Sequence, residues 1–199
     1  MPTITLSDVV DVFSKSGTPK ATNVRHIKNR PDYSPATDFY RPLRIALTAL
    51  HANGKDRKAL DSILPTISDL KKIKIYNELV EGYKKYWGRK DISWFNPPRG
   101  TYSHSGVDVR VNPELGLVID GKRSVIKLYL KTDEITKQRI ELIPALMEIS
   151  LRQHLQKDDI VGLLDVRKGK LHLLGTSITP ATAMVNAELA YIATLWPNI

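Results

Sequence analysis

The chain has 199 residues, of which 42% are hydrophobic, and its formal net charge is +9. This length and apolar fraction predict one compact unit that buries a core of its own. The absence of cysteine excludes disulfides, thiolate nucleophiles and cysteine-containing zinc sites. No run approaches the roughly 18 apolar residues of a membrane span, and the amino terminus lacks the features of a secretory signal. The sequence therefore predicts a cytoplasmic protein with no membrane partner.

The positive charge is concentrated in the first half of the chain. Residues 1–100 contain 18 basic and 10 acidic side chains, against 12 and 11 in residues 101–199. Such an excess favours phosphate polyanions, and DNA or RNA in particular, as partners. An acidic protein partner is the alternative that charge leaves open.

Residues 1–66 are expected to form a helical N-terminal lobe with a polar arm. The arm is residues 15–36, which are rich in Lys, Asn, Pro and Ser and are predicted to form a loop. A helix is then expected to begin at Thr37 or Asp38 and to end at Gly54.

Residues 67–199 are expected to form an α/β core domain, so that the fold class is mixed α/β. Its first helix is predicted between Ser68 and Gly88 from near-helical apolar spacing. On a helical wheel, one side of this helix gathers basic side chains together with Glu78. We call four of these cations the basic stripe: Lys71, Lys74, Lys85 and Arg89.

Residues 89–106 show no periodicity and are predicted to be a long irregular loop, whereas two β-hairpins are expected to form the sheet. The first spans residues 107–131 with a turn at Gly121-Lys122, which would place Glu114 opposite Tyr129. Its alternation would turn the apolar side chains to one face of the sheet: Leu115, Leu117, Ile119, Ile126, Leu128 and Leu130. The second spans residues 160–174 with a turn near Lys168-Gly169. The remaining predicted elements are a helix over 133–155 that Pro144 kinks or breaks, and a final helix that begins at Thr179-Pro180.

The polar face of the first hairpin is the first candidate for a chemical site. A helix carboxylate, an acid on one strand and a lysine on the next suit metal-dependent phosphodiester chemistry. This arrangement resembles the PD-(D/E)XK nuclease superfamily over about residues 68–175. The resemblance implies Glu78, Glu114, Asp120 and Lys131 as catalytic residues, with Glu114 and Asp120 holding Mg²⁺. It also departs from the family, because Tyr129 stands where the acid of the acid-any-lysine triplet is expected.

The segment between the long helix and the first hairpin is the second candidate. Trp94, Phe95 and Arg99 combine aromatic rings with positive charge, and single-stranded bases stack on such rings while cations follow the phosphates. Together with the basic stripe, these residues form the predicted nucleic-acid-binding set. The alternative is that Trp94 and Phe95 fold back into the core.

A third pattern consists of Arg44 and His51, seven residues apart on one predicted helix. Their spacing resembles that of HEPN-type ribonucleases. A partly buried histidine with no acid-base role is the other interpretation.

These observations predict that the protein associates with nucleic acid and has a divergent nuclease-like core, with or without retained Mg²⁺-dependent activity. A protein-interaction module, such as an immunity, toxin-neutralising or assembly subunit, is the alternative function. An unrelated enzyme for small anionic substrates is a third.

Overall fold

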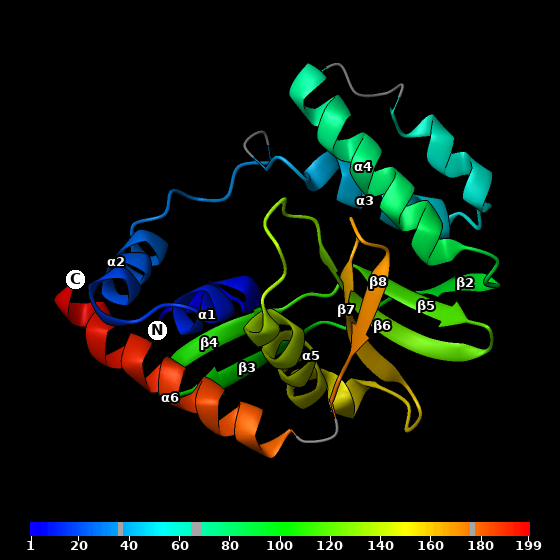
Figure 1. Cartoon of the computed structure of the whole chain (residues 1–199). Helices are drawn as coiled ribbons and strands as arrows, with labels where there is room; N and C mark the ends of the chain where they lie inside the picture. Colours follow the sequence, from blue (N-terminus) through cyan, green and yellow to red (C-terminus); the bar gives the residue numbers. More distant parts are fainter. Residues whose placement is uncertain (36–37, 65–68, 176–177) are drawn as a thin grey trace.

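The structure is a computed structural model that describes residues 1–35, 38–64, 69–175 and 178–199 (Figure 1). The helices are α1 (Leu6–Phe13), α2 (Gly17–Lys28), α3 (Arg41–Ala52), α4 (Leu70–Trp87), α5 (Lys137–Leu151) and α6 (Thr179–Leu195), with 3₁₀ segments η1 (Arg57–Ser62), η3 (Arg152–His154) and η4 (Trp196–Asn198). The strands are β1 (Thr3–Thr5), β2 (Ile92–Phe95), β3 (Gly100–His104), β4 (Val107–Val111), β5 (Leu115–Ile119), β6 (Lys122–Tyr129), β7 (Ile160–Asp165) and β8 (Lys170–Leu173). The predicted mixed α/β class is confirmed.

The strands form two sheets. The larger has the order β2-β5-β6-β7-β8, in which β6 and β7 run parallel and the other neighbours run antiparallel. The smaller has the order β1-β4-β3, with β1 parallel and β3 antiparallel to β4. The expected hairpin over 107–131 is therefore wrong in its first part, because β4 pairs with β1 and β3 instead of continuing into β5. Local alternation cannot reveal the pairing with β1, which lies about a hundred residues away, whereas β3 directly precedes β4 and pairs with it across a two-residue turn.

Two hydrophobic cores lie on opposite faces of the five-stranded sheet. One is formed with α3 and α4 and includes Leu117 and Leu128 of the sheet. The other is formed with α5, the smaller sheet and helices α1, α2 and α6, and includes Val125 and Leu163. Figure 1 shows α3 and α4 together on one side of the molecule, while α1, α2 and α6 gather beside β3 and β4. Residues 1–66 thus contribute to both cores.

Several predicted helix ends are confirmed. Asp69 caps α4 by accepting the backbone N–H groups of Lys71 and Lys72, and Gly88 ends the helix at a φ of 56°. α6 begins at Thr179 with Pro180 in its first turn, and the turn of the second hairpin falls near Gly169, as expected. Of the two caps predicted for α3, Thr37 lies outside the described residues, and the helix instead begins after Tyr40.

Three segment predictions are corrected by tertiary packing. Residues 15–36 contain α2, whose Val24 is fully buried and whose Ile27 packs against the same core, although most of the helix is polar. Residues 89–106 contain β2 and β3. β2 pairs with β5, more than twenty residues away, whereas β3 forms a hairpin with the adjacent β4 across Ser105-Gly106. α5 starts after Thr136 and runs through Pro144 without a break, because the surrounding core packing outweighs one lost backbone hydrogen bond.

The register of the β5–β6 hairpin differs from the predicted one by two residues. Asp120 and Gly121 both have positive φ, at 49° and 82°, and form a two-residue turn that pairs Ile119 with Lys122. Leu115 then pairs with Ile126 rather than with Leu128. A shift of two leaves each side chain on its predicted face, because the strand period is two. It changes which polar residue stands beside Glu114.

Within the described residues, none of the helices has the length and apolar character needed to cross a membrane.

Candidate functional site

Glu114, immediately before β5, forms a close pair with Lys127 of β6. The Lys127 Nζ lies 2.6 Å from Oε1 of Glu114, and the backbone N–H of Leu128 donates to Oε2 at 2.8 Å. Lys127 also donates to the backbone carbonyl of Asn112 at 2.9 Å. Both carboxylate oxygens of Glu114 therefore already accept hydrogen bonds from this hairpin.

α3 contributes a second cation, Arg44. Its Nη2 lies 2.6 Å from Oδ2 of Asp38, and the hydroxyl of Tyr33 donates to the same oxygen at 3.0 Å. Burial alone would raise the pKa of Asp38, but the hydrogen bonds from Arg44 and Tyr33 lower it overall. Burial likewise opposes the charge of Arg44, yet Asp38, with a smaller contribution from Glu114, raises the pKa of its guanidinium. Arg44 is thus a fixed positive charge within electrostatic range of Glu114.

The segment from β2 to β3 contributes an aromatic ring and a third cation. Trp94, on β2, projects from the same sheet face as the core under α3 and α4 and is half-buried there. Asn96 and Arg99 follow in the connection to β3, and both are exposed.

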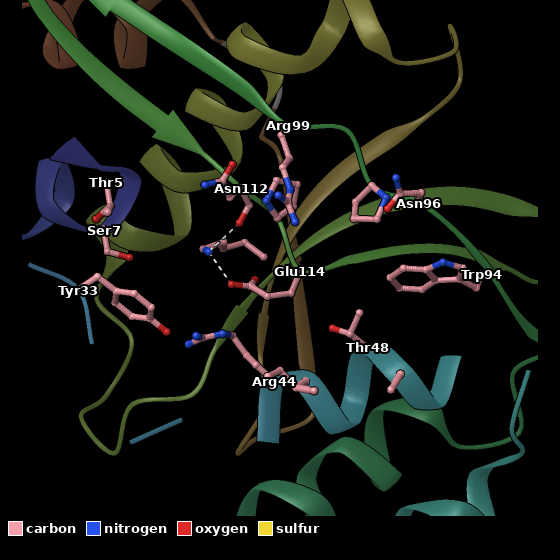
Figure 2. A pocket seen from close by; sticks show the side chains of 15 residues that line it. Thr5, Ser7, Tyr33, Arg44, Thr48, Trp94, Asn96, Arg99, Asn112 and Glu114 are labelled. Carbon is pink, nitrogen blue, oxygen red and sulfur yellow. Dashed lines mark hydrogen bonds and ion pairs between the residues drawn. The ribbon is translucent and has the colours of Figure 1, made fainter. Parts of the chain in front are cut away.

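These groups line one cleft with a volume of about 650 Å³, which we call the polar cleft. Figure 2 shows Glu114 near its centre, with Arg44 and Arg99 on opposite sides of it. Trp94 and Asn96 lie at one end of the cleft, and Thr5 and Ser7 at the other (Figure 2). The lining thus combines three cations, one carboxylate, amide groups and an indole ring.

A smaller cavity of about 150 Å³ adjoins the polar cleft, and we call it the basic cavity. It shares Arg44, Glu114 and Lys127 with the cleft and adds Lys131 and Arg139.

The four residues implied by the nuclease resemblance do not meet at one point. Glu114 and Lys131 line the basic cavity together. Glu78, on the outer side of α4, pairs with Arg167. Asp120 lies in the β5–β6 turn, where its carboxylate accepts the backbone N–H of Asp91 at 2.9 Å. The two-residue change of register explains why Lys127, and not the predicted Tyr129, stands beside Glu114.

The predicted nucleic-acid-binding residues also separate. Trp94 and Arg99 line the polar cleft. Phe95 points to the opposite face of the sheet, as strand alternation requires, and the guanidinium of Arg123 covers its ring at 3.8 Å from the centroid. The basic stripe is exposed on α4 and, at Arg89, just beyond its end, and none of its residues lines the cleft.

His51 does not share a surface with Arg44, although both belong to α3. Its Nε2 lies 2.6 Å from the hydroxyl of Tyr83, and its ring stacks on Trp87 at 4.6 Å between centroids. Burial lowers the pKa of His51 to about 4, because the interior disfavours the charged imidazolium. The structure places His51 in the core, as the non-catalytic interpretation expects.

The donors around Glu114 do not fit Mg²⁺, which prefers several free oxygen ligands. The one carboxylate there is already bound by an ammonium and a backbone N–H. If Lys127 is taken as the lysine of the acid-any-lysine triplet, the position of the acid is occupied by Val125, which is fully buried. Among the described residues, no group of three His, Cys, Asp or Glu side chains could hold a metal ion.

Sequence reasoning missed the parts of the cleft that come from distant segments. Lys127 could have been found, because an Asp-Gly pair favours the two-residue turn that sets the observed register. No local signal places Arg44 opposite Glu114, since α3 and β5 meet only through tertiary packing.

No family model matches this sequence, and no curated protein resembles it in sequence. Among solved structures, a "putative exonuclease" from Eubacterium rectale has a similar fold, with a TM-score of 0.51 and 12% sequence identity. The similarity covers 96% of this chain and 80% of the other. At this identity it shows a shared fold and nothing about activity.

Proposed function

We propose that the polar cleft binds a nucleic-acid strand, on a nuclease-like core that lacks a competent Mg²⁺ site. The observation that carries the proposal is the gathering of Arg44, Arg99 and Lys127 with Trp94 around one cleft. Cations bind the phosphates of a strand, and an indole ring gives an unpaired base a stacking surface. The fold shared with the "putative exonuclease" supports the nuclease-like part of the proposal.

The size of the cleft favours a single strand over a duplex. Its volume of about 650 Å³ lies in the range of pockets that enclose small ligands. A short stretch of unpaired strand fits such a space, whereas a duplex keeps its bases stacked and out of reach of Trp94.

Salt dependence of binding tests the proposal. We expect a fluorescein-labelled single-stranded oligonucleotide to bind with an affinity that falls linearly in log salt. Arg99 is exposed, so Arg99→Glu should leave the fold intact, weaken binding about tenfold and reduce the salt slope by about 0.7. Lys157→Glu makes the same charge change at another exposed position and is the matched control. Equal effects of the two variants would contradict a binding role for the cleft, and binding without salt dependence would favour a protein-interaction module.

Trp94 tests the stacking part of the proposal separately. Trp94→Leu should weaken single-strand binding by about 1–3 kcal/mol, while Trp94→Phe keeps a ring and should retain most of the affinity. Circular dichroism and thermal unfolding of both variants establish that the fold is retained. An unchanged affinity in folded Trp94→Leu would contradict stacking at this end of the cleft.

Cleavage assays test the metal part of the proposal. We expect little or no degradation of single-stranded or duplex DNA and RNA with Mg²⁺ or Mn²⁺. Robust cleavage that is lost in both Glu114→Ala and Lys131→Ala would show that these residues do form a working site.

A further inference from the structure

The basic cavity is built differently from the polar cleft that it adjoins. Four basic side chains line it: Arg44, Lys127, Lys131 and Arg139. Arg44 belongs to α3 and Arg139 to α5, while Lys127 lies on β6 and Lys131 just after it. Two helices and the end of one strand therefore bring their cations to one small space.

These cations are fixed in place but keep hydrogen-bonding capacity. Arg44 uses one guanidinium nitrogen on Asp38, and Arg139 uses one on Asp11. Lys131 also reaches Asp11, at 3.4 Å. A guanidinium has five N–H donors, so both arginines keep donors for a further acceptor. The carboxylates therefore position the cations without saturating them, and four cations face three carboxylates.

The apolar part of the lining strengthens the attraction for an anion. Leu128, Leu130 and Leu163 are buried side chains that border the cavity. Charges interact more strongly beside such groups than in open water. The cavity has a volume of about 150 Å³, less than a quarter of the 650 Å³ of the polar cleft, so it suits a small group such as a phosphate.

We infer that the basic cavity holds the terminal phosphate of a strand whose adjoining nucleotides lie in the polar cleft. The inference rests on the proposed function, because the two spaces share Arg44, Glu114 and Lys127. A terminal phosphate monoester offers three free oxygens and a charge near −2. An internal diester carries one charge and two free oxygens, and its chain must leave on both sides. The donors that these cations leave unused suit the three free oxygens of a monoester, and a small cavity beside the cleft suits a chain that leaves on one side only.

The inference is tested with one oligonucleotide in three forms: 5′-phosphorylated, 3′-phosphorylated and without a terminal phosphate. We expect one phosphorylated form to bind about tenfold more tightly than the unphosphorylated form near physiological salt. An unphosphorylated strand lengthened by one nucleotide controls for added charge and should bind like the shorter one. Inorganic phosphate should compete away the preference and leave the remaining affinity in place.

Two variants connect the preference to the cavity. Arg139→Gln should abolish it with little effect on the unphosphorylated strand. Lys131→Met removes a side chain that is 46% exposed and should also reduce the preference. It keeps the inference testable if Arg139→Gln fails to fold. Equal affinity for all three forms, or a preference that survives both variants, would overturn the inference while the proposed function stands. Failure of every form to bind would overturn both.

Discussion

The polar cleft and the basic stripe are two positively charged regions of the same protein with different construction. In the cleft, Arg44 and Lys127 come from distant segments, and each is fixed by a carboxylate. In the stripe, three cations come from α4 and Arg89 follows its end; all four are exposed and have no side-chain partner among the described residues. Fixed charges can position a ligand, because the cost of ordering the side chains has already been met in folding. Solvated charges act mainly through long-range attraction that salt screens.

The largest expected effect concerns His51, because the cleft depends on the packing of α3 against α4. His51 joins these helices through Tyr83 and Trp87, and its folded-state pKa is about 4. Between pH 6.5 and about 4 the unfolded chain binds a proton that the folded protein does not. Stability is therefore lost as the pH falls through this window, by about 3 kcal/mol in total from this group.

Urea unfolding at pH 7 and pH 4.5 measures this loss against a variant that lacks the imidazole. His51→Gln keeps a polar partner for Tyr83 and does not titrate, so the stability of the native protein relative to this variant should fall by about 2–3 kcal/mol on acidification. The same pH dependence in both proteins would contradict this account.

The next effect distinguishes a paired cation of the cleft from a solvated cation of the stripe. Lys127→Met leaves the Glu114 carboxylate, which is 14% exposed, without its ammonium partner. We expect the free energy of unfolding to fall by about 1–3 kcal/mol. The double variant Glu114→Gln with Lys127→Met should recover most of this loss. Lys74→Met, at an exposed stripe position, should change stability by less than about 0.5 kcal/mol. If Lys127→Met and Lys74→Met lost similar free energies of unfolding, the proposed difference between the cleft and the stripe would be contradicted.

The smallest effect is expected in the stripe itself. Replacing Lys71 and Lys74 together with Glu should reduce retention on a polyanion column at low salt, where charges act over about 30 Å. Near physiological salt the range shortens to about 8 Å, and single-strand affinity should change by less than the tenfold expected for Arg99→Glu. If the double variant lost more single-strand affinity than Arg99→Glu, the binding surface would lie on α4 instead of in the cleft.

The elements whose packing follows from local pattern could be predicted from the sequence. α4 has an unbroken apolar stripe with Asp69 before it and Gly88 after it, and both ends lie within one or two residues of the prediction. The β7–β8 hairpin and the start of α6 could likewise be predicted, from Gly169 and Pro180 respectively. Leu115, Leu117, Ile126 and Leu128 were assigned to the correct face, since that assignment depends only on alternation.

The candidate site was determined by the sequence only in part. Glu114, Trp94 and Arg99 were selected from their residue types, and the cleft contains all three. Their neighbours were decided by the tertiary structure: the β5–β6 turn places Lys127 beside Glu114, and the packing of α3 on the sheet brings Arg44 to the same cleft. α2 and β2 also depend on tertiary contacts, because α2 packs on α6 near the other end of the chain and β2 pairs with β5 more than twenty residues away. β3, by contrast, forms a local hairpin with β4. Local patterns fix the face that a residue occupies, whereas a binding site depends on which faces meet.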